Sequence, residues 1–226
     1  MGPARLITID GPAGAGKSTA ARGLAKALGW TYLDSGAFYR LVAWQVRRHG
    51  VNPEDEAAVA GLLPHLTPEP GEDDHGFYLQ VDGLRLSTEL RTPEVSREAS
   101  RVAKLPAVRR WVTDKLRRLA QGRRVVAEGR DLGTVVFPEA DLKLYLEADL
   151  TIRAARRQQE QDALGAGGDL SATLSALAAR DAQDINRAEA PLKVPEGAVI
   201  VDTSRLTPEE VVARCLKLAA ERLEGV

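Results

Sequence analysis

The chain has 226 residues, of which 44% are hydrophobic and 28% charged, as is typical of a globular protein with one sizeable core. Lysines and arginines total 31 and aspartates and glutamates total 32, so the net charge is −1. This balance excludes a surface that attracts nucleic acid or anionic membrane over its whole extent, so any anion site must be built locally from clustered arginines.

Strand-like and helix-like patterns alternate through the first fifty residues. The β-branched run at 5–10 predicts a buried strand, and the periodicity of 17–28 predicts a helix that Gly29 ends. A second strand is expected at 30–34 and a second helix at 38–50. This order favours an α/β fold with a parallel sheet and helices on both of its faces.

The middle of the chain departs from this rhythm. Two alternating runs within 76–87 flank Asp82 and Gly83, a pattern that is typical of a β-hairpin. We therefore expect a small inserted subdomain here. Thr92 is expected to cap the first of two helices that separate near Pro106.

The strand–helix rhythm resumes after residue 122. Strands are expected at 123–129, 141–148 and 198–204, and helices at 150–163, 172–190 and 206–225. The last helix carries a capping box between Thr207 and Glu210. The glycine-rich stretch 164–171 is expected to be a flexible loop. The five strands predict a doubly wound, five-stranded parallel sheet.

A phosphate-loop motif lies between the first strand and the first helix. Gly11-x-x-x-x-Gly16-Lys17-Ser18 has the spacing at which backbone N–H groups form a nest for phosphate oxygens at a helix N-terminus. Lys17 can reach the β- and γ-phosphates, and the Ser18 hydroxyl can ligate Mg²⁺. We predict binding of ATP with Mg²⁺. The loop residues of this site are Gly11, Pro12, Ala13, Gly14, Ala15, Gly16, Lys17, Ser18 and Thr19.

Two groups of arginines could meet a second anion. Arg180, Asp184 and Arg187 have the spacing of one helix face, although a solvated ion-pair ladder would have the same pattern.

The second group consists of Arg153, Arg156 and Arg157, which also share a face. Only the more distant Glu160 offers them an acid on their own helix, so we expect them to meet something anionic. They precede the glycine-rich stretch, which is the layout of a mobile lid over a triphosphate.

The segment Glu128–Asp131, EGRD, ends a predicted strand. Open α/β sheets bind ligands at this edge, so Arg130 and Asp131 are candidate site residues. A plain turn is the alternative reading.

Five segments resemble the bacterial cytidylate kinases, a family of nucleoside monophosphate kinases in the P-loop NTPase superfamily. They are ITIDGPAGAGKST (7–19), LDSGAFYR (33–40), SREASRVAKLPAVR (96–109), EGRDLGTVVFPEADLKLYLEA (128–148) and RDAQDINRAEAPL (180–192). The resemblance implies a single P-loop kinase domain over 1–226. Its parts would be a core at about 1–64 and 91–226, an inserted β-containing subdomain for the nucleoside monophosphate at about 65–90, and a mobile lid at about 153–171.

The resemblance also implies a role for each matching residue. The acceptor CMP or dCMP would contact Ser35, Arg40, Ser100, Arg109, Arg130, Asp131, Arg180, Asp184 and Arg187. Among these, Ser100, Arg109 and Asp131 would read the cytosine edge. Arg180 and Asp184 would hold the ribose hydroxyls, and Arg40, Arg130 and Arg187 the phosphate.

On the donor side, the resemblance implies that Arg153 and Arg156 join the ATP site. Lys17, Arg130 and Arg157 would be catalytic, with Arg157 on the transferring phosphoryl group. Glu128 stands where the family often has aspartate, and it would either contact Mg²⁺ through water or serve the structure alone.

The expected reaction transfers the γ-phosphoryl group of ATP to the phosphate of CMP or dCMP. The second pKa of a phosphate monoester is about 6, so the acceptor is already ionised and needs no general base. Two alternatives stay open. One is a kinase acting on a hydroxyl, with Asp34 as the base. The other is a nucleotide-sensing module without a second substrate site.

Partners and compartment are inferred from the cysteine content and from the apolar runs of the chain. The single cysteine, Cys215, lies in an apolar helical pattern and is expected to fill the core, in keeping with a reducing compartment. The first ten residues lack the apolar region of a signal peptide, and no apolar run is long enough to cross a membrane. We expect a cytoplasmic monomer of pyrimidine nucleotide metabolism that binds neither nucleic acid nor membrane.

Overall fold

The computed structural model describes residues 5–73, 76–163, 167 and 169–223. The chain divides into two compact units. The first, which we call the sheet unit, comprises Met1–Tyr32 and Gly122–Val226, and the second, the middle unit, comprises Leu33–Gln121.

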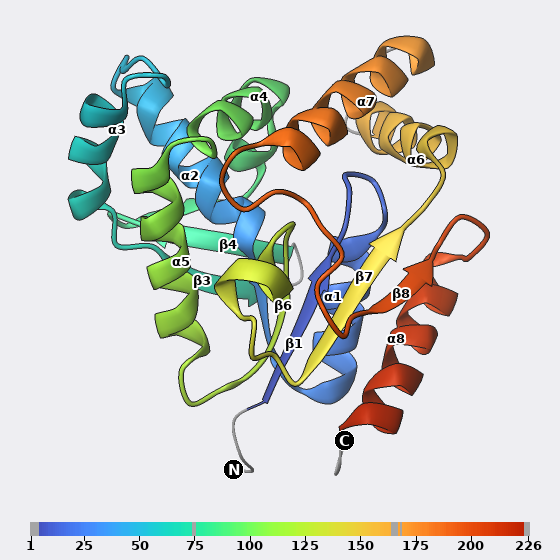
Figure 1. Cartoon of the computed structure of the whole chain (residues 1–226). Coiled ribbons are helices and arrows are strands. Elements are labelled where there is room, and N and C mark those ends of the chain that lie inside the picture. The colour runs from blue at the N-terminus through green and yellow to red at the C-terminus, as the bar shows by residue number, and fades with distance from the viewer. Residues whose placement is uncertain (1–4, 74–75, 164–166, 168, 224–226) are drawn as a thin grey trace. The chain divides into compact units, whose positions relative to one another are not determined.

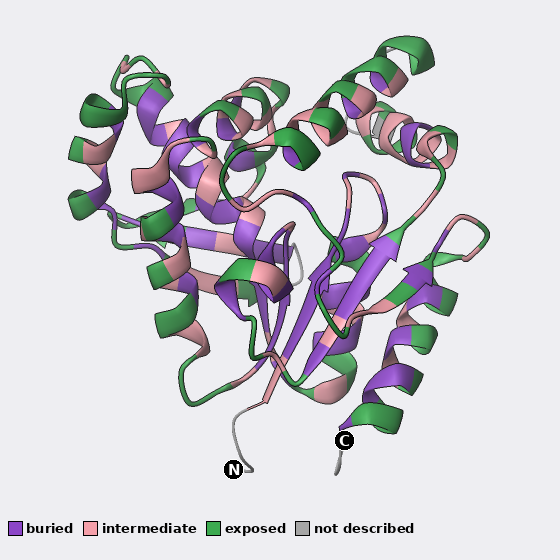
Figure 2. Cartoon of the chain, viewed as in Figure 1, coloured by how far each residue is buried: buried purple, intermediate pink, exposed green. Residues whose placement is uncertain are grey.

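A five-stranded parallel sheet organises the fold (Figure 1). Its strands, in spatial order, are β2 (Thr31–Asp34), β6 (Arg124–Glu128), β1 (Arg5–Asp10), β7 (Leu142–Glu147) and β8 (Val199–Asp202). The central strand β1 pairs in parallel with β6 and β7. Its Ile7 and Ile9, like Leu144 of β7, are fully buried. Figure 2 shows β1 and β7 coloured mostly as buried. Such apolar strands need helices on both faces, and the predicted five-stranded parallel sheet is confirmed.

Four helices and one π-helical turn complete the sheet unit. They are α1 (Lys17–Leu28), η3 (Leu132–Val136), α6 (Leu150–Ala163), α7 (Leu170–Asn186) and α8 (Pro208–Arg222). Helix α1 packs against α8 and β6, and α6 lies beside α7 (Figure 1). Gly23 allows the close approach of α1 and α8, because a Cβ there would lie 2.5 Å from Val212. The predicted capping box of Thr207 and Glu210 is confirmed.

The middle unit consists of helices and a small sheet. The helices are α2 (Ser35–Arg48), α3 (Glu56–Leu62), α4 (Pro93–Val102) and α5 (Pro106–Ala120), with short 3₁₀ turns η1 (Leu63–His65) and η2 (Thr88–Arg91). The strands β3 (Glu69–Asp73), β4 (Gly76–Val81) and β5 (Leu84–Leu86) form an antiparallel sheet. Asp82 and Gly83 both have positive φ, as the predicted hairpin turn requires.

Strand β3 and the bounds of α2 and α7 differ from the sequence-based expectation. Strand β3, EPGED, shows no apolar alternation and was not predicted, because it pairs with β4 through its backbone. Helix α2 begins at Ser35 rather than at residue 38, because the Asp34 carboxylate accepts a hydrogen bond from the Ala37 N–H and caps it. Helix α7 ends at Asn186 rather than at residue 190, so the predicted helical position of Arg187 is wrong.

The expected lid at about 153–171 is described in part. Its residues up to 163 and from 170 onward are helical, whereas residues 164–166 and 168 lie outside the described residues. In the part of the chain that the structure describes, no helix has both the length and the apolar character needed to cross a membrane.

Candidate active site

The phosphate loop follows β1 and leads into α1. Gly11, Gly14 and Gly16 have φ values of 142°, 76° and 82°, a region that side chains rarely adopt. A Cβ on Gly11 would lie 1.9 Å from the carbonyl oxygen of Leu146 on β7. The loop therefore needs glycine both for backbone conformation and for its close approach to β7.

Lys17 is the first residue of α1 and is buried. Its Nζ donates a 2.7 Å hydrogen bond to the Pro12 carbonyl within the loop. Burial lowers the pKa of the Lys17 ammonium to about 7. The positive charges of Arg130 and Arg180 lower the pKa further, and the carboxylates of Glu128 and Asp10 oppose this effect. Arg130 and Arg180 are therefore electrostatic neighbours of the phosphate loop.

Oxygen groups that could hold Mg²⁺ are few. Ser18 is exposed on the first turn of α1, and no group of three or more metal-ligating acids, histidines or cysteines occurs among the described residues. A hydroxyl ligand suits a hard cation such as Mg²⁺, which usually keeps several waters and binds substrate phosphates. The chain thus fits a Mg²⁺ ion that arrives with a nucleotide. Glu128 is buried and accepts a 2.8 Å hydrogen bond from the Tyr32 hydroxyl.

An arginine–carboxylate cluster, which we define as Arg130, Asp131, Asp184 and Arg187, lies in the sheet unit. Arg187 lies 3.5 Å from Asp131 and 3.7 Å from Asp184, and Arg130 lies 3.2 Å from Asp184. Both carboxylates are buried. The shared helix face that we predicted for Arg187 is wrong. The chain instead leaves α7 in an extended conformation at Arg187, and this brings its guanidinium to both carboxylates.

The three arginines of α6 differ from one another. Arg153 is buried, donates to the Ala13 carbonyl in the phosphate loop, and forms a 2.6 Å ion pair with Asp181 of α7. An acid that the helix of Arg153 does not itself offer is thus supplied by α7 across the helix pair.

Arg156 and Arg157 are held in separate places. Arg156 donates to the carbonyls of Thr203 and Leu206 in the loop after β8. Arg157 is more exposed and pairs with Glu160 at 3.0 Å. Two of the three arginines thus hold α6 to the phosphate-loop side of the sheet unit, and Arg157 is the most accessible of them.

The middle unit carries the other four predicted acceptor residues. Ser35 and Arg40 lie on α2, Ser100 on α4 and Arg109 on α5, and α2 packs against both α4 and α5. Arg40 forms a 2.7 Å ion pair with Asp34. Arg109 is buried, and it donates to the Ala103 carbonyl. Its guanidinium lies over the ring of Tyr39.

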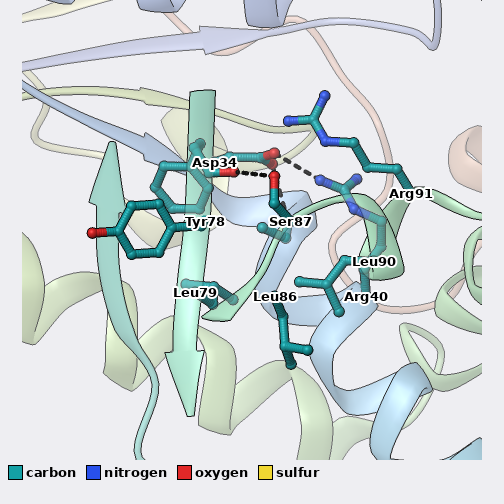
Figure 3. Close-up of a pocket in the computed structure, with 10 residues that line it drawn as sticks. Asp34, Arg40, Tyr78, Leu79, Leu86, Ser87, Leu90 and Arg91 are labelled. Carbon is teal, nitrogen blue, oxygen red and sulfur yellow. Dashed lines mark hydrogen bonds and ion pairs between the residues drawn. The ribbon is translucent and has the colours of Figure 1, made fainter. Parts of the chain in front are cut away.

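A small cavity of about 10 Å³ lies where α2 begins beside the small sheet (Figure 3). Asp34, Arg40 and Arg91 bring charge to its wall, and Leu79, Leu86 and Leu90 make much of the rest apolar. The volume suits a single water molecule, so this cavity is too small for a nucleotide.

Sequence reasoning missed two acids in this region. Asp181 directly follows the predicted Arg180, but nothing in its local spacing indicates Arg153 as its partner. Asp10 is fully buried and accepts hydrogen bonds from the backbone N–H groups of Leu132 and Gly133. A charged residue at the end of an otherwise apolar strand was a signal that could have identified it.

The profile of the cytidylate kinase family matches residues 7–221. The chain belongs to the cytidylate kinase family. The cytidylate kinase of Stutzerimonas stutzeri (strain A1501) is 42% identical to it over 97% of both chains. The cytidylate kinase of Mycobacterium leprae (strain Br4923) is 42% identical over 98% of each. The resemblance stated from the sequence is confirmed.

Solved structures support the fold of this family member. A gluconokinase from Sinorhizobium meliloti 1021 aligns with a TM-score of 0.50 at 16% identity, covering 96% of this chain and 93% of its own. The shikimate kinase of Bacteroides thetaiotaomicron aligns with a TM-score of 0.50 at 13% identity, covering 95% and 97%. These similarities concern the arrangement of the sheet and helices alone.

Proposed function

We propose that this chain transfers the γ-phosphoryl group of ATP to the phosphate of CMP or dCMP, giving ADP and CDP or dCDP. Membership of the cytidylate kinase family supports the reaction class. The observation that carries the assignment is the buried Asp131 among arginines. It lies just after β6, the strand that pairs with the phosphate-loop strand β1.

On the donor side, the phosphate loop would hold the triphosphate of ATP through its backbone and Lys17. The depressed pKa of Lys17 suits this role, because an anion beside the ammonium would restore its charge. Arg153 and Arg156 would support the ATP site indirectly, because their hydrogen bonds to the Ala13 and Thr203 carbonyls hold α6 beside the loop. Arg157, the accessible member of the three, would meet the transferring phosphoryl group.

On the acceptor side, cytosine offers an N4 amino donor and an acceptor edge at N3 and O2. Asp131 would accept from N4, and Arg109 and Ser100 would donate to the acceptor edge. Uracil would place a carbonyl against the Asp131 carboxylate, so two acceptors would face each other where cytosine supplies a donor. Arg180 and Asp184 would hold the ribose, while the phosphate would meet Arg40, Arg130 and Arg187. Ser35, at the start of α2, would complete the acceptor set.

Mg²⁺ would be held by the Ser18 hydroxyl together with the triphosphate. When bound, it neutralises charge on the phosphate oxygens. The chain's own contribution is to align two anions and to offset their repulsion with Lys17 and the arginines. No proton needs to be removed, because the acceptor phosphate is already ionised near neutral pH.

The hydroxyl-kinase alternative requires Asp34 to act as a base. One of its oxygens accepts from the Ala37 N–H at 3.0 Å, and the other pairs with Arg40 at 2.7 Å. Both oxygens of the Asp34 carboxylate thus already have partners within the middle unit, so this alternative has no support in the geometry.

A panel of acceptors tests the proposal. ADP formation is measured with CMP, dCMP, UMP, AMP and shikimate as a model alcohol, each against ATP alone. We expect CMP and dCMP to be turned over fastest and the alcohol not at all. If no nucleoside monophosphate raises ADP formation above the rate with ATP alone, the assignment is wrong. Saturable ATP binding without such turnover would favour the sensing module.

We further propose that the enzyme works as a monomer in the cytoplasm, without nucleic acid or membrane partners. Cys215 supports a reducing compartment, because it is a free and fully buried thiol. Burial raises the pKa of this thiol to about 12, which makes it unreactive. Sedimentation of the purified chain at micromolar concentration tests the monomer.

A further inference from the structure

Asp10 ends β1 and immediately precedes the phosphate loop. It is fully buried, and its two carboxylate oxygens are used separately. Oδ1 accepts a 2.9 Å hydrogen bond from the Leu132 N–H, and Oδ2 accepts a 2.7 Å hydrogen bond from the Gly133 N–H. Both donors belong to η3, which begins directly after Arg130 and Asp131.

The chemistry of this contact is selective for a carboxylate. A carboxylate offers two acceptor oxygens and no donor, so it can bind two N–H groups at once. An asparagine of the same size would direct an NH₂ group at one of those donors. Burial raises the pKa of Asp10 to about 6, against the lowering by the two backbone hydrogen bonds. The negative charge of Asp131 adds to the increase, and Lys17 opposes it. The chain therefore keeps a charge here at an energetic cost.

The turn that Asp10 binds has little room to move. A Cβ on Gly133 would lie 2.9 Å from Pro195 and 3.0 Å from the Thr8 hydroxyl of β1. The Asp131 carbonyl accepts from the N–H groups of Val135 and Val136, which ties its backbone into η3. The segment that bears Arg130 and Asp131 is thus joined to β1 by the hydrogen bond from the Gly129 N–H to the Ile9 carbonyl, by the Asp10 side chain and by close packing.

We propose that Asp10 is a positioning residue that fixes the acceptor-binding turn, Arg130–Asp131, against the strand that carries the phosphate loop. Its carboxylate touches neither substrate and acts through Asp131 and Arg130. This inference rests on the proposed function, in which Asp131 reads cytosine and Arg130 holds the acceptor phosphate. The contact between β1 and η3 thereby aligns the acceptor with the phosphate loop.

The test compares Asp10→Asn with the wild-type chain. KM for CMP is expected to rise about five- to hundred-fold, the range that corresponds to one mispaired buried polar group. The preference for CMP over UMP is expected to fall. Affinity for a non-hydrolysable ATP analogue, measured by calorimetry, is expected to change less than about twofold, because the phosphate loop keeps its own backbone.

Thr8→Val is the matched control. Thr8 lies on the same strand, is equally buried, and faces the same glycine. Its hydroxyl has no hydrogen-bond partner among the described residues. KM for CMP is expected to stay at the wild-type value. Unchanged CMP kinetics in folded Asp10→Asn overturn the proposal, and so does an equal loss of affinity for both nucleotides, which would indicate a structural role alone.

A measurement on the wild-type chain covers the case in which Asp10→Asn does not fold. The amide protons of Leu132 and Gly133 report protonation of Asp10 by NMR, and cytidine serves as a ligand without a titrating phosphate. Cytidine affinity is expected to weaken below about pH 6 with the same midpoint as these amides. Affinity that stays constant while the amides titrate overturns the proposal. If the chain binds cytidine but does not phosphorylate CMP, only the proposed function fails.

Discussion

The phosphate loop is shaped by backbone conformation within a few residues, whereas ion pairs between distant segments shape the arginine–carboxylate cluster. In the loop, three glycines adopt φ values that other residues rarely adopt, and a single lysine supplies the side-chain charge. In the cluster, two arginines and two buried carboxylates neutralise one another at 3.2 to 3.7 Å. In the proposed function, the loop would hold a triphosphate whatever its base, while the cluster would distinguish one base and one phosphate from others.

Gly11→Ala should have the largest effect on the loop. Its Cβ would meet the Leu146 carbonyl at 1.9 Å, so the loop cannot keep its conformation. We expect binding of an ATP analogue to become undetectable by calorimetry. Gly16→Ala is the control, because it also has positive φ but no atom within 4 Å of the added Cβ. The Gly16→Ala variant should lose only about 1–2 kcal/mol of binding free energy for the ATP analogue, which is the cost of placing a side chain in the left-handed region. An equal loss of ATP-analogue binding in the two variants would show that backbone strain, and not the clash with Leu146, weakens the site.

Lys17→Ala should reduce kcat by about a hundred- to a thousand-fold, the usual cost of removing one group that stabilises transition-state charge. Steady-state ADP formation with CMP measures it. Lys26→Ala removes an exposed lysine from the last turn of the same helix and should leave kcat unchanged. Near-normal turnover in Lys17→Ala would show that Lys17 does not stabilise the transition state.

Asp131→Asn tests the cluster rather than the loop. The amide carries an acceptor oxygen and an NH₂ donor, so it can accept from cytosine N4 or donate to the uracil carbonyl. The preference for CMP over UMP in kcat/KM should fall by about 1–3 kcal/mol. Asp114→Asn, at an exposed position on α5, should leave it unchanged. Affinity for the ATP analogue should stay constant in both variants. An unchanged base preference in Asp131→Asn would show that another group reads the base.

The pH dependence of ATP binding should show the smallest effect. Below about pH 7 the Lys17 ammonium is protonated, and above it the nucleotide-free chain loses this charge. Affinity for the ATP analogue should therefore fall as pH rises through 7, by at most about tenfold per unit. Subtracting the profile of Lys17→Ala removes the ligand's own titration. Parallel profiles in the two chains would contradict the depressed pKa of Lys17.

Sequence patterns predicted the five parallel strands, the hairpin at Asp82 and Gly83, and the phosphate loop. Each depends on periodicity or on backbone conformation over a few residues. The end of α7 was predicted four residues late, because alanine and glutamate after Asn186 favour helix. The chain nevertheless turns there, and Arg187 pairs with Asp131 and Asp184. Tertiary ion pairs outweighed the local preference.

By itself, the sequence determined the phosphate-loop motif, because glycine spacing and a following helix are local features. Only the tertiary structure decided which acid meets which arginine. Arg153 pairs with Asp181, 28 positions away, and Asp10 holds the Leu132 N–H across 122 positions. Hydrogen bonds and ion pairs act over a few ångströms in space, and the local sequence around one partner does not show which distant residue is the other. Their partners exist only after the sheet and the helix pair have formed.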